Sequence, residues 1–210
     1  MEIFLDDQQV DSEFIGEHTV EDALRHVQAN VCNAGEVVVG VRCDGRDVGP
    51  NEMAATLGKS AATFNKLEVF TSTPQRLVVE AMSQASSALD DTEAACQRIA
   101  DLLTRGDTAD GIAELGDCLG VWQKIHDAVG QAIQMLQLDP DKLKVEQEPL
   151  LDVVSRPKEV LLEIKQALES QDHVLLADIM QYEFGDVTEK WHKLVNMLRR
   201  EAEGLVETDA

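Results

Sequence analysis

Two runs of apolar residues repeat with alternating spacings of three and four residues, and this periodicity constrains the fold more than any other feature. The first run follows Pro74 and the second ends shortly before Pro140. Such spacing places one apolar stripe along a helix that packs against another helix. Because residues 105–107 (Arg-Gly-Asp) interrupt the pattern, we expect an antiparallel hairpin of two long helices over residues 74–138. The stripe positions are Val78, Met82, Ala85, Leu89, Thr92, Cys96, Ile99 and Leu103, then Ile112, Leu115, Leu119, Trp122, His126, Val129, Ile133 and Leu136.

A second helical hairpin is expected over residues 157–205. Pro149 and Pro157 interrupt the chain before it, so the sequence predicts a crossover with one short helix at about residues 150–154. Proline is favoured at the first position of a helix, and we therefore expect the third long helix to begin at Pro157. The fourth long helix follows a turn and carries the remaining apolar stripe, which comprises Leu176, Met180, Val187, Trp191, Leu194 and Leu198.

The two tryptophans of the chain fall at similar places in the two hairpins. Trp122 is followed by Gln-Lys-Ile and Trp191 by His-Lys-Leu, and the two stretches align after a shift of about one helical turn. Taken together, residues 73–210 are expected to form a four-helix-like antiparallel bundle with both indoles at equivalent levels of its core.

Residues 1–72 predict a small sheet with one main helix. Asp44–Gly45 is a strong signal for a two-residue hairpin turn, and Thr19 offers a hydroxyl that caps the start of a helix. The element order is strand, strand, helix, strand, strand, strand. We expect strands at residues 2–5, 9–15, 36–43, 46–48 and 66–70, a helix over 20–31 that stops at 33–35, and a helical turn near 51–57.

This element order resembles the ubiquitin-like β-grasp fold, in which a sheet wraps across a single helix. Members of that family that act as sulfur carriers or conjugated modifiers end in a free Gly-Gly, whereas this chain continues through Thr73 and Pro74 into a helix. The resemblance therefore implies a docking or scaffolding module. The overall class is expected to be α+β, with a β-grasp-like module followed by long helices.

The charge of the chain limits its partners. The chain has 40 aspartates and glutamates and 18 lysines and arginines, which gives a net charge of −22. Such a field repels phosphate backbones and anionic lipid surfaces, so we expect no nucleic acid, no membrane and, where a partner is charged, a basic one. With no apolar leader or spanning segment and no C-x-x-C motif, the chain is expected in the cytoplasm as a protein with four reduced cysteines: Cys32, Cys43, Cys96 and Cys118.

One motif raises the possibility of metal chemistry. Glu189 and His192 have the E-x-x-H spacing by which ferritin-like helical bundles hold a di-metal site. The matching stretch of the first hairpin has Gln123 where a second carboxylate is needed before His126, so a surface pair is the favoured interpretation. Nucleotide-binding loops and nucleophile motifs are absent from the sequence, and no cofactor is predicted.

Residues 172–185 carry apolar side chains on more than one helical face. One interpretation is a central helix that packs on all its neighbours. The other is an exposed groove in which Leu176, Met180 and Phe184 anchor a partner helix. Core packing is the favoured interpretation, and the groove is retained as a hypothesis.

The function expected from these features is a non-catalytic protein-interaction module, which is an adaptor, scaffold or chaperone. Residues 74–205 look like bacterial secretion and flagellar-export chaperones, which are small acidic helical proteins, and residues 176–183 are similar to a stretch found in uncharacterised bacterial helical proteins. The alternative is a metal-binding bundle or metal-dependent enzyme centred on Glu189 and His192. Self-association through the heptad stripes is compatible with the first hypothesis.

Overall fold

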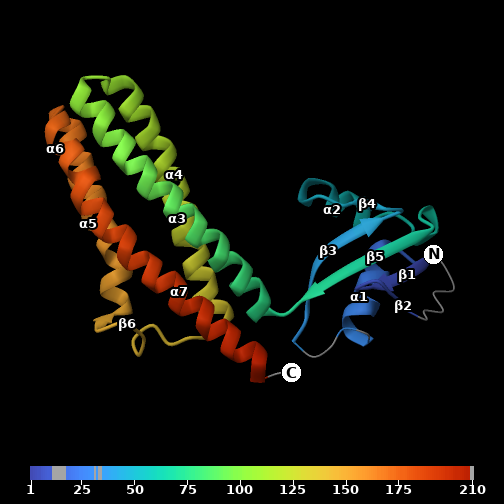
Figure 1. The fold of residues 1–210 in the computed structure, drawn as a ribbon. Coiled ribbons are helices and arrows are strands. Elements are labelled where there is room, and N and C mark those ends of the chain that lie inside the picture. The colour runs from blue at the N-terminus through green and yellow to red at the C-terminus, as the bar shows by residue number, and fades with distance from the viewer. Residues whose placement is uncertain (11–17, 31, 33–34, 209–210) are drawn as a thin grey trace. The chain divides into compact units, whose positions relative to one another are not determined.

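The computed structural model describes residues 1–10, 18–30, 32 and 35–208. The chain divides into two compact units, Met1–Pro74 and Gln75–Ala210. Figure 1 shows a mixed sheet with helices in the first unit and long helices in the second. The expected α+β class and the order of a sheet-containing part followed by a helical part are confirmed at this level.

The sheet of the first unit has five strands in the order β2-β1-β5-β3-β4. Strand β1 pairs parallel with β5, and the β1–β2, β3–β4 and β3–β5 pairs are antiparallel. The strands are β1 (Glu2–Leu5), β2 (Gln8–Val10), β3 (Val37–Cys43), β4 (Arg46–Asp47) and β5 (Lys66–Ser72). The second predicted strand was expected to reach residue 15, and its residues 11–15 lie outside the described residues.

The predicted turn at Asp44–Gly45 is present, and so is a turn between the first two predicted strands. Asp6 and Asp7 adopt φ values of 46° and 66°, and Asp44 and Gly45 adopt 48° and 81°. Two successive residues with positive φ match the twist of the flanking strands, and Asp and Gly tolerate this region. The Asp44 carboxylate also accepts hydrogen bonds from the backbone N–H groups of residues 65 and 66, which ties the turn to the start of β5.

Helix α1 (Val20–Asn30) covers one face of this sheet. Its start is a capping box, since Asp22 N–H donates to Thr19 Oγ1 at 3.2 Å and Thr19 N–H donates to the Asp22 carboxylate at 3.0 Å. The expected helix end at residues 33–34 lies outside the described residues. Helix α2 (Pro50–Leu57) and the 3₁₀ turn η1 (Ala61–Thr63) precede β5. The buried core comprises Ile3, Val20, Ala23, Val27, Val41, Cys43, Leu67 and Val69.

Helices α3 (Pro74–Arg105) and α4 (Thr108–Met135) form the predicted antiparallel hairpin (Figure 1). Gly106, at φ 90°, ends α3 in the left-handed conformation that glycine adopts without strain. The stripe predicted for α3 is buried. In α4 the expected phase was wrong at several positions, because the buried residues are Gly111, Leu115, Cys118, Trp122, Ile125, Val129 and Ala132. Ile112, Leu119, His126 and Ile133 instead lie on one flank of the helix.

The segment after α4 differs from the prediction. A small hairpin, β6 (Lys144–Val145) and β7 (Glu148–Pro149), leads into α5 (Leu150–Ser170), a single helix that contains Pro157. The short crossover helix and the start of the third helix at Pro157 were therefore wrong. Pro149 ends the hairpin and stands immediately before the helix, while Pro157 is accommodated inside it.

The last helical stretch is interrupted by one wider turn. Helix α6 (His173–Asp178) passes through the π-helical segment η2 (Ile179–Glu183) into α7 (Phe184–Thr208). Residues from α3, α4, α5, α6, η2 and α7 contribute to a single buried core. Within the described residues, no helix is both long and apolar enough to span a membrane.

Candidate functional site

Pro157 and Trp191 together define the centre of the helical unit. Proline has no backbone N–H, so within α5 the carbonyl of Val153 lacks its usual helical donor at position 157. The indole N–H of Trp191, from α7, donates to that carbonyl at 3.2 Å. Because Trp191 is fully buried, this hydrogen bond satisfies two groups that would otherwise be costly to bury. The proline thus creates the acceptor that positions the tryptophan.

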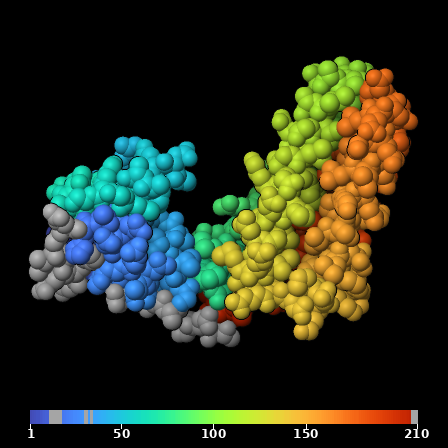
Figure 2. All heavy atoms as spheres, turned by 180° about the vertical axis from the view of Figure 1, so that it is seen from behind, coloured from blue at the N-terminus to red at the C-terminus, as the bar shows by residue number. Residues whose placement is uncertain are grey.

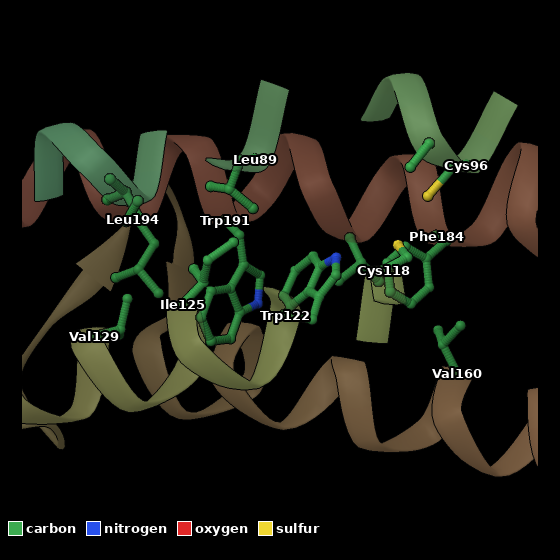
Figure 3. Close-up of a cluster of buried hydrophobic side chains, with 14 of the residues drawn as sticks. Leu89, Cys96, Cys118, Trp122, Ile125, Val129, Val160, Phe184, Trp191 and Leu194 are labelled. Carbon is green, nitrogen blue, oxygen red and sulfur yellow. The ribbon is translucent and has the colours of Figure 1, made fainter. Parts of the chain in front are cut away.

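Trp191 belongs to a cluster of three aromatic side chains in the core. Trp122 of α4 lies between Trp191 and Phe184, with ring centroids 5.0 Å and 5.2 Å away and both contacts edge-to-face (Figure 3). His126 stacks on the indole of Trp191 at a centroid distance of 5.7 Å. Edge-to-face pairs add stability beyond the area that they bury, so the cluster is a rigid base for the surface above it. The two tryptophans do meet in the core, as expected from the resemblance of the hairpins.

The cluster forms the floor of a groove, which we call the aromatic groove. It encloses about 310 Å³ between α4 and α5. Figure 2 shows these two helices side by side on this face. Its apolar walls include Leu161, which is 42% exposed, and the half-exposed His126 lies at its edge. The lining residues are Leu119, Trp122, Gln123, His126, Val154, Pro157, Lys158, Leu161 and Phe184.

One polar atom of this region has no partner. In the part of the chain that the structure describes, Nε1 of Trp122 is buried and forms no hydrogen bond. A buried unpaired donor costs about 1–3 kcal/mol, and native proteins retain few of them. Trp122 is 5% exposed and lines the aromatic groove, so its ring is held at this site at an energetic cost.

Sequence reasoning missed most of the groove. Leu119 and His126 were assigned to the core stripe of α4, and Val154 and Leu161 were not singled out. A usable signal was present in α5, where the apolar doublets 150–151, 153–154 and 161–162 supply more apolar residues than one buried stripe requires. In the structure Leu151 and Val154 lie beside buried residues of the core stripe, and Leu161 and Leu162 are both exposed next to the buried Val160.

The residues proposed as partner anchors are not at the surface. Leu176 and Met180 are fully buried, and Phe184 is 1% exposed, although it also lines the aromatic groove from below. A π turn shifts the helical phase, so the apolar residues before and after η2 all turn toward the same core. The described structure therefore favours core packing for residues 176–184. The large apolar or aromatic side chains of this region that are exposed are Val174, Leu175 and Tyr182.

The two candidate metal ligands have other partners. Glu189 pairs with Lys193 at 3.0 Å, and Nε2 of His192 lies 3.4 Å from a carboxylate oxygen of Asp90. Both line a polar hollow of about 310 Å³ with Glu93, among other residues. Across the described ranges, no group of three or more His, Cys, Asp and Glu side chains is arranged to hold a metal ion.

Cys96 and Cys118 approach each other from α3 and α4 (Figure 3). Both cysteines are free of a disulfide bond and buried. The hydrogen bond with the Cys118 thiol, followed by burial, raises the pKa of Cys96. A thiol with a raised pKa carries little thiolate and reacts slowly, so this cysteine has the character of a core residue.

Two family models match the chain. Residues 80–194 match a family described as a domain of unknown function, DUF8042, and this stretch is more than half of the chain. The chain belongs to the DUF8042 family. The DUF8042 match includes every residue that lines the aromatic groove. Residues 1–73 match a model described as the TP0873 N-terminal domain, and neither description names a ubiquitin-like family. No curated protein and no solved structure matches the chain.

Proposed function

We propose that the chain is a non-catalytic protein-interaction module, acting as an adaptor, scaffold or chaperone, and that its aromatic groove receives an amphipathic helix of a partner protein. The observation that carries the proposal is the groove itself, an apolar trough between two helices with a rigid aromatic floor. In helix-in-groove recognition the partner helix inserts apolar side chains that are three and four residues apart. A trough between two neighbouring helices, α4 and α5, has a suitable shape for such a helix.

The charge of the chain favours a particular kind of helix. A net charge of −22 attracts basic segments and repels acidic ones over about a Debye length. We therefore propose an occupant with one apolar face, which enters the groove, and lysines and arginines on the opposite face. Gly116 and Gly130 of α4 have open space where a Cβ would be, so no side chain stands between the helix backbone and a partner at these two positions.

The finer assignments of the fold belong to this proposal. The strand order β2-β1-β5-β3-β4 with a parallel β1–β5 pair and one covering helix supports a β-grasp docking module over residues 1–72. The single core shared by α3, α4, α5 and α7 supports a four-helix-like bundle over residues 73–210. A role related to secretion or flagellar export would use the bundle to hold an exported helix. Four unpaired cysteines support action in the reducing cytoplasm.

The metal-dependent alternative has less support. It requires further inward carboxylates near Glu189 and His192, whereas within the described residues Glu189 pairs with Lys193 and His192 lies beside Asp90.

The test is capture of the partner with two matched variants. The tagged protein and its Leu161→Asp and Leu162→Asp variants are passed through native lysate, and retained proteins are identified by mass spectrometry. Both leucines are on α5 and about half exposed, at 42% and 52%, but only Leu161 lines the groove. We expect a helical segment with a basic face to be retained by the parent and by Leu162→Asp, and to be lost with Leu161→Asp.

A synthetic peptide of the retained segment is then expected to bind the purified parent and the Leu162→Asp variant, and not the Leu161→Asp variant. Equal loss in both leucine variants, or retention by both, would contradict the groove as the binding site. Thermal unfolding of the variants by circular dichroism controls for folding, and both are expected to melt close to the parent because the replaced side chains are exposed.

A further inference from the structure

The helical unit has a second hollow whose chemistry differs from that of the aromatic groove. It encloses about 590 Å³ between the β6–β7 hairpin and α7, and we call it the basic groove. Its lining residues are Lys144, Val145, Glu146, Lys193, Asn196, Met197, Arg200 and Glu201. Three cationic side chains, two carboxylates and one amide therefore line this groove, so its charged side chains are more often basic than acidic. In the whole chain, acidic residues outnumber basic ones by more than two to one.

The local structure explains why these side chains meet. Lys193, Asn196 and Arg200 are three, four and seven residues apart, so they share one face of α7. Val145 is 5% exposed and anchors the β6–β7 hairpin in the core. Its neighbour Lys144 lies on the hairpin wall of the groove, across from the side chains of α7. Ion pairs from Glu146 to Lys193 at 3.3 Å and from Glu148 to Lys190 at 2.6 Å hold the hairpin against the helix.

Two of the cations have no partner of their own. Among the described residues, Lys144 and Arg200 form no ion pair, whereas Lys193 pairs with Glu146 and Glu189. In so acidic a chain most basic side chains find a carboxylate, as the ion pairs along α5 and α7 illustrate. Unpaired cations on two facing walls are free to bind an external anion. Arginine offers paired N–H groups that match phosphate and carboxylate oxygens, and lysine adds a point charge.

We propose that the basic groove is a binding site for a small organic anion that carries phosphate or carboxylate groups. Lys144 and Arg200 bind the anionic group from opposite walls, and the side-chain amide of Asn196 donates a further hydrogen bond. Val145 and Met197 offer apolar contact for the organic part, and the volume falls in the range of small-molecule sites. Of the two carboxylates that line the groove, Glu146 is paired with Lys193. Carboxylates elsewhere on the chain are screened by salt beyond about 8 Å at physiological ionic strength.

This site is independent of the proposed function. It shares no lining residue with the aromatic groove, and Asn196 and Arg200 lie beyond the stretch that matches DUF8042. No glycine-rich phosphate loop is involved, which is why sequence motifs did not indicate it. The binding groups are side chains from two elements that are about 50 residues apart in the chain.

The test is isothermal titration of the full chain with inorganic pyrophosphate and, separately, with citrate. We expect saturable binding of at least one probe, with the tighter of the two identifying phosphate or carboxylate as the preferred group. Lys144→Gln and Arg200→Gln should each weaken binding about tenfold, the effect of losing one charge-assisted hydrogen bond. Lys124→Gln is the matched control, since Lys124 is also without an ion pair among the described residues but lies on α4, outside the basic groove.

Binding of neither probe would overturn the proposal. So would an equal loss of affinity in Lys124→Gln, because the effect would then be one of net charge alone. Leu161→Asp should bind both probes as the parent does, so failure of the aromatic groove and failure of the basic groove give different results.

Discussion

At the scale of single residues, Pro157 and Trp191 show how one unusual residue can be matched by another. A proline in the interior of a helix costs about 3 kcal/mol or more, in part because it leaves a carbonyl without its donor. Here the freed carbonyl of Val153 accepts the indole N–H of Trp191. Neither residue alone predicts this contact, because they are 34 positions apart in the chain and on different helices.

This pairing predicts a measurable coupling. Trp191→Phe should lower the free energy of unfolding, through lost packing and because the Val153 carbonyl loses its donor. In a Pro157→Ala background the new backbone N–H at position 157 supplies that carbonyl, so the same change should cost less, by about 1 kcal/mol. Urea unfolding of the parent, both single variants and the double variant measures the difference. Equal costs in the two backgrounds would show that the hydrogen bond contributes nothing.

At the scale of elements, the sequence predicted the α3–α4 hairpin well and α5–α7 less well. The stripe of α3 is uninterrupted, and Gly106 marks its end. Two things could not be predicted from local patterns. Pro157 looks like a helix start because proline is favoured at the first helical position. Its tolerance inside α5 depends on Trp191, which is distant in the sequence. The π turn at η2 changes the helical phase, so residues 172–185 resemble a helix with two apolar faces when they are read with a constant period.

The same junction brings two carboxylates together. The hydrogen bond with Glu163 of α5, with smaller effects of burial and charge, raises the pKa of Glu183 in η2. A carboxyl with a raised folded pKa binds its proton more tightly when folded, so its contribution to stability is present at low pH and is lost as the pH rises through that pKa. At pH 7 the two side chains repel each other.

Glu183→Gln should therefore raise the melting temperature at pH 7, and the gain should vanish below about pH 4, where glutamates are protonated in the unfolded chain as well. Thermal unfolding at the two pH values is the measurement. Glu169→Gln, which removes the exposed partner of Lys165, serves as the control and should give no gain at pH 7. A gain that is equal at both pH values would point to a cause other than charge.

At the scale of the whole molecule, the order of the expected elements predicted the α+β class, but neither that order nor the net charge indicated where the sites lie. Both grooves depend on tertiary structure. The aromatic groove needs the flank of α4 to face α5, and the basic groove needs a hairpin of two-residue strands to fold against α7. The predicted E-x-x-H pair was visible in sequence because both residues are on one helix, yet its surroundings place a lysine and an aspartate beside it.

The net charge of −22 also has a consequence for stability. Like charges repel more strongly in the compact state than in the extended chain, and salt screens this repulsion. Most of the described ion pairs are exposed, and exposed pairs contribute little, so salt removes little stabilisation by screening them. We therefore expect the melting temperature to rise as sodium chloride is increased from low to physiological concentration and beyond. A melting temperature that falls with salt would mean that the ion pairs, rather than the repulsion, dominate the electrostatics of this fold.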